Sequence, residues 1–337
     1  MRIYSLPMIV LFGSGLIITM PPALAQKEQW AETAMAAKGA IEEHLYDKAT
    51  SLYSQALKVA ETFGEDDPRL TATLRDTADC LMQYSHNYAL AEQMLKREQR
   101  IMLRLGPDFP GLVAGKDLLG RAQYGQGKYK EAEESFQEAI KISPEAGGFN
   151  DRDWRQEILP RLGRCYQAEG NYEQAEGCFK TQLASAMAKH AGVQSLYYPY
   201  RNLANYYFET QNYDKAVFLF KRCLAILQNS PNWQDNHNGQ SQDLLVIGAI
   251  YSAQKKDEEA IKYFRQAAHE ARQDPNAAET LFQALYPNLA KLELARGNKS
   301  ASQAAANEAL AIAKRLGYTV QILEINKFLS IKSPVHK

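Results

Sequence analysis

The chain lacks most of the features that mark catalytic, metal-binding or nucleic-acid-binding proteins. Its 337 residues hold 39 Lys and Arg against 39 Asp and Glu, which gives a formal net charge of +0. A nucleic-acid-binding domain usually has a basic stripe and a high isoelectric point, so we expect no nucleic-acid partner. The 4 cysteines show no C-x-x-C spacing, and no H-E-x-x-H, G-x-S-x-G or glycine-rich phosphate loop is present. We therefore expect no enzymatic activity, no metal and no cofactor.

Long apolar runs are also scarce, and the clearest one lies at the N-terminus. Arg2 precedes an almost wholly apolar or small stretch at residues 6–20, which is followed by PPALA at residues 21–25 and a polar chain from Gln26 onward. A basic start, an apolar core and an A-x-A ending are typical of a cleaved secretory signal. The alternative, an uncleaved anchor, needs about 20 apolar residues, and the two prolines interrupt this segment early. We predict a signal peptide at residues 1–25, export to the periplasm or the cell exterior, and no membrane insertion of the mature protein.

The rest of the chain contains an internal repeat. In the first five occurrences an aromatic residue is followed three positions later by Ala and, four positions after that, by an aromatic residue or Leu, as in Tyr129-Ala132-Phe136. The last two occurrences have weaker first positions, Asp257 and Lys299. The occurrences begin at residues 46, 88, 129, 172, 213, 257 and 299, so successive starts are 41 to 44 residues apart.

A second amphipathic segment precedes each occurrence. Leu159, Leu162, Gly163 and Tyr166 stand at i, i+3, i+4 and i+7, which is one face of a helix. A short polar turn with a glycine, such as residues 169–171, stops this first helix before the second begins. The pattern predicts antiparallel helix pairs in which a Gly or Ala of the first helix meets the small residue of the second.

At these positions the chain resembles the tetratricopeptide repeat family, whose usual repeat is shorter. The longer period is similar to that of the kinesin light chain class, and so are two linkers, FGEDDP at residues 63–68 and LGPDFP at residues 105–110. HEAT and armadillo solenoids have overlapping periods, but the small and aromatic positions favour tetratricopeptide repeats. The resemblance implies an all-α solenoid of about seven helix pairs at residues 26–316, wound into a right-handed superhelix. Residues 317–337 would then form a C-terminal capping helix and tail.

The register also places the cysteines. Cys223 stands at the small, buried position that Ala56 and Ala139 fill in other repeats. Cys165 and Cys178 lie on the two helices of one repeat, at offsets that do not face each other. The sequence leaves open whether these two residues form a disulfide.

The resemblance further implies that the first helices line a concave groove that binds a protein or an extended peptide. In the third to fifth repeats the groove positions are rich in Arg and Asn, with Tyr and Phe at neighbouring offsets as aromatic anchors. The predicted groove residues are Arg121, Arg161, Arg164, Tyr198, Arg201, Asn202, Asn205, Phe208, Asn288 and Lys291.

These side chains suggest the chemistry of the partner. Arginine binds a carboxylate through two N–H groups, and an Asn amide can pair with both N–H and C=O of an extended backbone. We therefore expect an acidic peptide or a C-terminal carboxylate in the groove, unless the arginines pair with Asp and Glu of adjacent helices. The expected function is an exported, non-enzymatic protein–protein interaction scaffold. The alternative is a structural or assembly subunit of an envelope complex that acts through self-association as a homo-oligomer.

Overall fold

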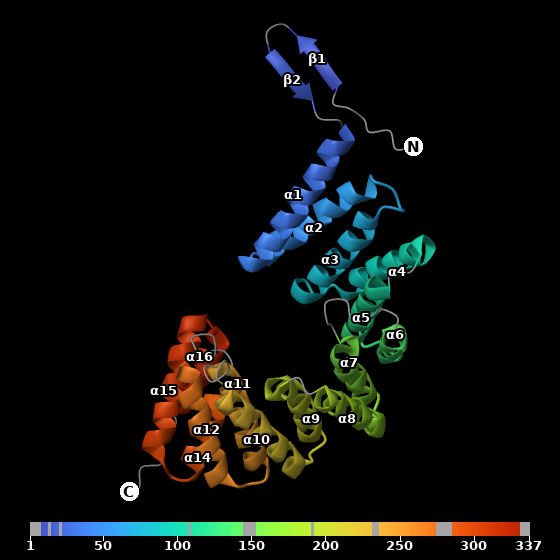
Figure 1. Ribbon diagram of the computed structural model, residues 1–337. Coiled ribbons are helices and arrows are strands. Elements are labelled where there is room, and N and C mark those ends of the chain that lie inside the picture. Colours follow the sequence, from blue (N-terminus) through green and yellow to red (C-terminus); the bar gives the residue numbers. More distant parts are fainter. Residues whose placement is uncertain are drawn as a thin grey trace. The chain divides into compact units, whose positions relative to one another are not determined.

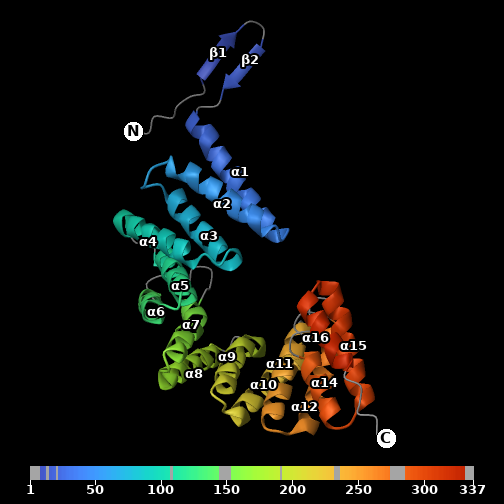
Figure 2. The ribbon, with the colours of Figure 1, turned by 180° about the vertical axis from the view of Figure 1, so that it is seen from behind.

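The structure is a computed structural model that describes residues 8–12, 15–19, 22–106, 109–143, 153–189, 192–230, 236–273 and 285–330. By its contacts the chain divides into two compact units, Met1–Cys178 and Phe179–Lys337. Helices make up nearly all of the described chain, as Figures 1 and 2 show from opposite sides. The predicted all-α array of helix pairs is therefore confirmed.

The N-terminal segment contains the two strands found among the described residues. β1 (Met8–Phe12) and β2 (Gly15–Thr19) form an antiparallel hairpin in which Met8 lies opposite Thr19. Both strands are rich in Ile, Val and Leu, and β-branched residues favour strands. α1 (Pro22–Glu42) begins with a proline, whose missing N–H costs nothing at the start of a helix. The segment predicted as a signal thus comprises this hairpin and the first residues of α1. Across the described residues, none of the helices has both the length and the apolarity needed to cross a bilayer.

Seven helix pairs are described along the chain. The first helices are α1, α3 (Pro68–Tyr84), α5 (Phe109–Gly125), α7 (Trp154–Ala168), α9 (Tyr197–Glu209), α11 (His237–Ala253) and α14 (Tyr286–Ala295). The second helices are α2 (Tyr46–Glu61), α4 (Tyr88–Leu105), α6 (Tyr129–Ile142), α8 (Tyr172–Ala188), α10 (Tyr213–Asn229), α12 (Asp257–Arg272) and α15 (Lys299–Leu316). Each second helix begins at the residue where the repeat pattern begins. The 3-10 helix η2 (Val193–Leu196) precedes α9, and α16 (Thr319–Ser330) follows the last pair.

A buried phenylalanine on the second helix forms the centre of several pairs. Phe136, Phe220 and Phe264 occupy the same register position, and each is at most 1% exposed. A Cβ added to Gly120 would lie 2.7 Å from the Phe136 ring, and one added to Gly248 would lie 2.6 Å from the Phe264 ring. The glycine of the first helix therefore faces the aromatic ring of the second helix, whereas the sequence suggested that it faces the small residue. The absent side chain allows the ring to lie directly against the first helix.

The turn inside each pair contains a residue with left-handed backbone, two positions before the second helix. This residue is glycine in three pairs, with φ of 74° to 80°: Gly127, Gly170 and Gly297. In the other four pairs it carries a side chain, with φ of 50° to 60°: His44, His86, Gln211 and Lys255. Residues with a Cβ adopt this conformation at some cost in free energy, so the chain geometry of the repeat overrides the local preference at these four positions.

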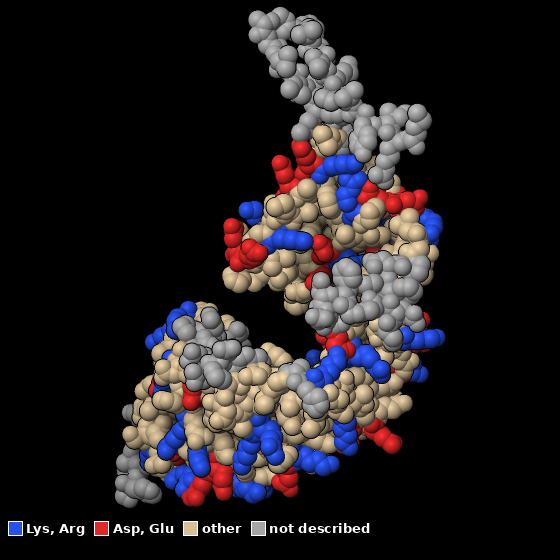
Figure 3. Space-filling model, viewed as in Figure 1, with Lys and Arg blue, Asp and Glu red and all other residues tan. Residues whose placement is uncertain are grey.

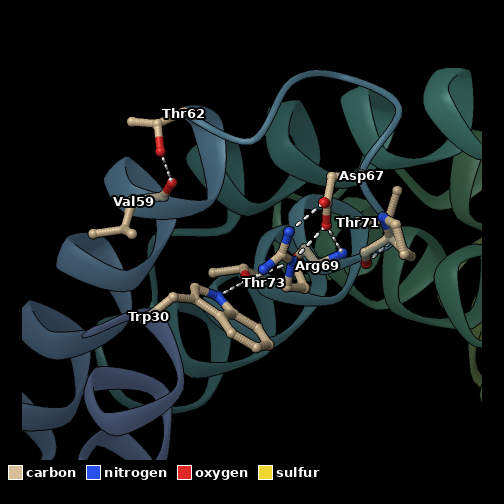
Figure 4. Close-up of polar contacts among 8 residues, drawn as sticks. Trp30, Val59, Thr62, Asp67, Arg69, Thr71 and Thr73 are labelled. Carbon is tan, nitrogen blue, oxygen red and sulfur yellow. Dashed lines mark hydrogen bonds and ion pairs between the residues drawn. The ribbon is translucent and has the colours of Figure 1, made fainter. Parts of the chain in front are cut away.

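Polar contacts join the first two pairs (Figure 4). The Asp67 carboxylate accepts a hydrogen bond from the backbone N–H of Arg69 at 2.9 Å and so caps α3, which begins at Pro68. Arg69 Nε also donates to Asp67 Oδ1 at 2.7 Å. Trp30 Nε1 of α1 donates to Thr73 Oγ1 of α3 at 2.9 Å. The Trp30–Thr73 hydrogen bond therefore joins the first pair to the second, while the Asp67–Arg69 contacts fix the start of α3.

All four cysteines are free and buried. Cys223 is 0% exposed, as its register position predicted. Burial raises the pKa of Cys165 to about 12 and the pKa of Cys178 to about 11. Both groups are therefore neutral thiols that fill space in the core of the fourth pair, and they form no disulfide with each other in this structure.

Candidate functional site

Ion pairs join successive first helices of the first unit, between residues about one repeat apart. Arg121 Nη1 of α5 lies 3.2 Å from Asp79 Oδ1 of α3, and Arg161 Nη1 of α7 lies 2.8 Å from Asp117 Oδ1 of α5. Two of the predicted groove arginines thus pair with aspartates of the neighbouring helix. This is the alternative that the sequence had left open for these side chains.

Arg164 differs from these two arginines. It lies on α7, one turn after Arg161, and is exposed. Within the described part of the chain it forms no ion pair with a carboxylate. Its guanidinium is therefore available to an external partner.

A pocket of about 270 Å³ lies beside these side chains. We call it the arginine pocket, and it is built entirely from α3 to α7 of the first unit. Its lining combines three arginines with aromatic, apolar and amide side chains: Met82, Gln83, Tyr88, Arg121, Tyr124, Gly125, Phe136, Arg161 and Arg164. Such a surface can bind an anionic group and an apolar group side by side.

The two tyrosines of the arginine pocket are residues that the sequence analysis missed as site residues. Tyr88 opens α4 and packs against Gly125, where an added Cβ would lie 2.5 Å from Tyr88 Cδ1. Tyr124 is 37% exposed and follows Arg121 by three residues on α5, so both lie on one side of that helix. The sequence analysis placed groove positions only at fixed offsets from the Leu and the following Gly or Ala of each first helix. Neither tyrosine stands at such an offset. An exposed aromatic residue three positions after a groove arginine was the available signal.

All charged side chains that line the arginine pocket are positive. Arg121, Arg161 and Arg164 contribute three positive charges, and Asp79 and Asp117 pair with two of them. Burial and the nearby Glu157 raise the pKa of Asp117, and Arg161 and Arg121 oppose that effect. Arg164 has no carboxylate partner among the described residues, so it is the part of the pocket suited to an anion.

In the second unit, the predicted groove residue Arg201 is committed to internal contacts. Its Nε lies 3.0 Å from Asp243 Oδ1 of α11, and its Nη2 donates to Gln242 Oε1 at 2.5 Å. Asp243 is 0% exposed and also accepts a hydrogen bond from the Tyr197 hydroxyl at 3.2 Å. Burial raises the pKa of Asp243 to about 6, against the lowering effects of Arg201 and Tyr197. This cluster serves the packing of α9 against α11.

The other predicted residues of α9 have mixed surroundings. Asn202 Nδ2 donates to Gln182 Oε1 at 3.1 Å, so this amide is used inside the unit. Asn205 and Phe208 are half-buried, and Tyr198 is 60% exposed. These residues belong to the second unit, whereas the arginine pocket belongs to the first. The predicted groove residues are therefore divided between two units.

The last two predicted groove residues, Asn288 and Lys291, are exposed on α14. Lys291 lines a second cavity of about 340 Å³ between α14, α15 and α16. The rest of that lining is mostly apolar: Pro287, Ala290, Ala306, Ala309, Gln321, Glu324, Ile325 and Phe328. Among the described residues, no three His, Cys, Asp or Glu side chains come together to hold a metal ion.

Comparison with protein-family models identifies the repeats. Models described as tetratricopeptide repeat match residues 114–146, 155–229 and 200–268. These matched segments are tetratricopeptide repeats. The matched residues cover most of the pairs α5–α6, α7–α8, α9–α10 and α11–α12, and they contain all eight predicted groove residues from Arg121 to Phe208. Tetratricopeptide repeats form protein–protein interaction scaffolds, and the fold is typically non-catalytic.

Solved structures share this fold at low sequence identity. BtubC (BKLC) from P. vanneervenii is 22% identical with a TM-score of 0.52, over 73% of this chain and 91% of that one. Nearly identical TPR-like repeats of the kinesin light chain kind from Podosopora anserina are 20% identical with a TM-score of 0.54, over 64% and 100%. The quorum sensor NprR from B. thuringiensis is 13% identical with a TM-score of 0.57, over 92% and 83%. No curated protein matches the chain in sequence.

Proposed function

We propose that this tetratricopeptide repeat protein is an exported, non-enzymatic scaffold that binds an acidic segment of a partner protein in the arginine pocket. The observation that carries the proposal is Arg164, which has no carboxylate partner among the described residues, beside two arginines already paired with Asp79 and Asp117. The partner protein supplies a carboxylate to Arg164.

The openness of the arginine pocket favours a peptide side chain over a free metabolite. Small-molecule sites usually bury most of the ligand surface, whereas this pocket of about 270 Å³ is open to solvent. It fits one acidic residue with a neighbouring apolar side chain against Tyr88 and Tyr124. The rest of an extended segment would run along the first helices.

The charge of the pocket favours a carboxylate over a phosphate. One carboxylate provides a partner for Arg164, whereas a phosphate group carries about −1.5 to −2 at neutral pH and would be repelled more strongly by the nearby carboxylates of Asp79 and Asp117. The bidentate geometry of arginine also suits a planar carboxylate.

A charge reversal on α7 tests the proposed function. Arg164 and Arg155 are both exposed arginines of α7, and their separation of nine positions places them on opposite faces of the helix. A random-peptide display selection on the wild-type protein should enrich Asp or Glu next to an aromatic residue. The selected peptide should bind Arg164→Glu about tenfold more weakly or worse, a loss of about 1.4 kcal/mol, and should bind Arg155→Glu as it binds the wild type. Enrichment of uncharged peptides would refute the acidic-ligand proposal. An equal loss of affinity in the two variants would also refute it.

Export is tested separately. We propose that residues 1–25 direct the chain out of the cytoplasm and are removed, because the basic start, apolar core and A-x-A ending match a signal sequence. Cell fractionation followed by mass spectrometry should find the protein outside the cytoplasm with Gln26 at its N-terminus. A cytoplasmic chain that retains Met1 would refute export and leave the peptide-binding proposal intact.

A further inference from the structure

The first helix of the array has an outward face that is acidic around an exposed apolar residue. α1 buries Ala37 completely on its inner side. At 100° per residue, Glu28 and Met35 lie nearly opposite Ala37, with Glu32 and Glu42 beside them. Met35 is 72% exposed, and the three glutamates are exposed as well. We call Glu28, Glu32, Met35 and Glu42 the acidic end face.

The last helix has an outward face of the opposite charge. α16 packs against α15 and closes the second cavity with Ile325 and Phe328, yet none of its residues is buried. Val320, Leu323 and Lys327 lie on the side opposite Ile325. Val320 and Leu323 are each 66% exposed. We call Val320, Leu323 and Lys327 the basic end face.

The outward faces of α1 and α16 are less polar than the end faces expected of a solenoid that stays monomeric. A terminal helix without a further neighbour normally presents a polar outer face, because exposed apolar ends cause association. Here Met35 occupies the centre of one end face, and Val320 with Leu323 occupies the other. The array thus ends on apolar residues at each terminus.

We propose that the acidic end face of one copy binds the basic end face of a second copy. Charge decides between the possible pairings. A pair of acidic end faces would bring six glutamates together. A pair of basic end faces would bring Lys327 of one copy near Lys327 of the other. The mixed pairing sets Lys327 of one copy against Glu28 and Glu32 of the other, while Met35 packs on Val320 and Leu323.

The pairing is heterologous, since one copy contributes its acidic end face and the other contributes its basic end face. It therefore leaves a free end after every addition, and chains grow with concentration unless the ring closes. One helix face per partner is smaller than the interface of a stable complex, which buries about 1,200 to 2,000 Å². The association is consequently weak, reversible and sensitive to salt. None of these residues lines the arginine pocket, so the inference is independent of peptide binding.

Sedimentation velocity of the purified protein tests the proposal. At low ionic strength the weight-average mass should rise with concentration above the 37.9 kDa of one chain, and about 0.5 M salt should reduce it, because exposed charges are screened beyond about 4 Å at that concentration. Met35→Glu and Leu323→Glu should each remain monomeric alone. An equimolar mixture of the two variants should form a one-to-one pair and nothing larger, because each retains one intact end face.

Matched variants separate this pairing from misfolding and from other partners. Leu103 of α4 is 67% exposed and belongs to neither end face, so Leu103→Glu should associate like the wild type. Lys327→Glu should weaken association, and adding Glu28→Lys with Glu32→Lys should restore it. The proposal is overturned if the wild type stays monomeric at about 1 mM, a concentration that reveals even weak complexes. Self-association of the Met35→Glu variant in the absence of other variants would also overturn it. So would a protein that binds lipid vesicles through Lys327 and does not self-associate.

Discussion

Arg161 of α7 reaches back one repeat to Asp117 of α5, where its Nη1 lies 2.8 Å from Oδ1 of a carboxylate that solvent scarcely reaches. The arginine side chain is 32% exposed and the aspartate side chain 6% exposed, so the pair is buried at its acidic end. The same arginine lines the arginine pocket. One ion pair therefore contributes both to the packing of two repeats and to the charge of the candidate site.

Removing this arginine should destabilise the protein more than removing the pair. Arg161→Met leaves the buried Asp117 carboxylate without its partner, which we expect to cost about 2 kcal/mol, somewhat less than for a fully buried pair. In the double variant Arg161→Met with Asp117→Asn, no buried charge remains, and at least half of that loss should be recovered. Urea denaturation of the two variants measures the difference. A double variant that is less stable than the single variant would contradict this account of the pair.

The stability of the second unit should depend on the protonation of Asp243. Because burial raises its pKa from 3.8 to about 6, the folded state binds the proton more tightly than the unfolded state does. The stabilisation is then fully present below pH 3.8 and is lost as the pH rises to about 6. The loss amounts to about 3 kcal/mol for a shift of this size. Asp243→Asn removes the titrating group, so the difference in unfolding free energy between wild type and variant should change by about 2 kcal/mol from pH 4 to pH 6, with the rest of the loss outside this range. A constant difference over this range would show that Asp243 does not titrate there.

Replacing a left-handed residue by glycine should stabilise a repeat turn. Gln211 is exposed and has a φ of 60°, a conformation that costs about 1 kcal/mol for a residue with a Cβ. Gln211→Gly should raise the unfolding free energy by about 0.5 kcal/mol, since glycine also loses more backbone entropy on folding. Gln273 ends α12 with a φ of −79°, so Gln273→Gly should give no gain. Thermal melts of both variants provide the comparison, and an equal effect in the two would contradict the backbone explanation.

The glycine that faces a buried ring should tolerate no side chain. Gly248→Ala places a Cβ about 2.6 Å from the Phe264 ring, and overpacking of this kind costs about 1 to 3 kcal/mol. Gly177 of α8 has nothing within 4 Å of an added Cβ. Gly177→Ala should therefore stabilise α8 by up to about 1 kcal/mol, since alanine is the better helix former. Chemical denaturation should show opposite signs for the two variants, and a loss in both would contradict the packing geometry.

The helix pairs were predictable from the sequence because their determinants are local. Five of the second helices begin where an aromatic residue, Ala and a further aromatic or Leu recur at helical spacing, as at Tyr129 and Tyr213, and α12 and α15 begin at weaker copies of the pattern. A helix face is determined by residues within two turns of one another. The repetition of that face along the chain reveals the fold without knowledge of distant contacts.

The candidate site was only partly predictable. Arg121, Arg161 and Arg164 were placed on the first helices, and the structure brings all three to one pocket. Their pairing with aspartates about one repeat away was an open alternative, because residues 42 or 44 apart meet only when the packing of successive first helices is known. Tyr88 reaches the pocket because Gly125 leaves room for its ring, and that contact joins residues far apart in the chain.

The sequence by itself determined the repeat, its register and the identity of the buried positions, since each depends on periodic burial along a helix. Tertiary structure alone decided which groove arginine lacks a carboxylate partner among the described residues, where the arginine pocket lies and which faces of α1 and α16 are exposed. Those properties depend on distances between atoms of different helices. An ion pair or a cavity changes with shifts of an ångström, to which the pattern of apolar residues along a single helix is insensitive.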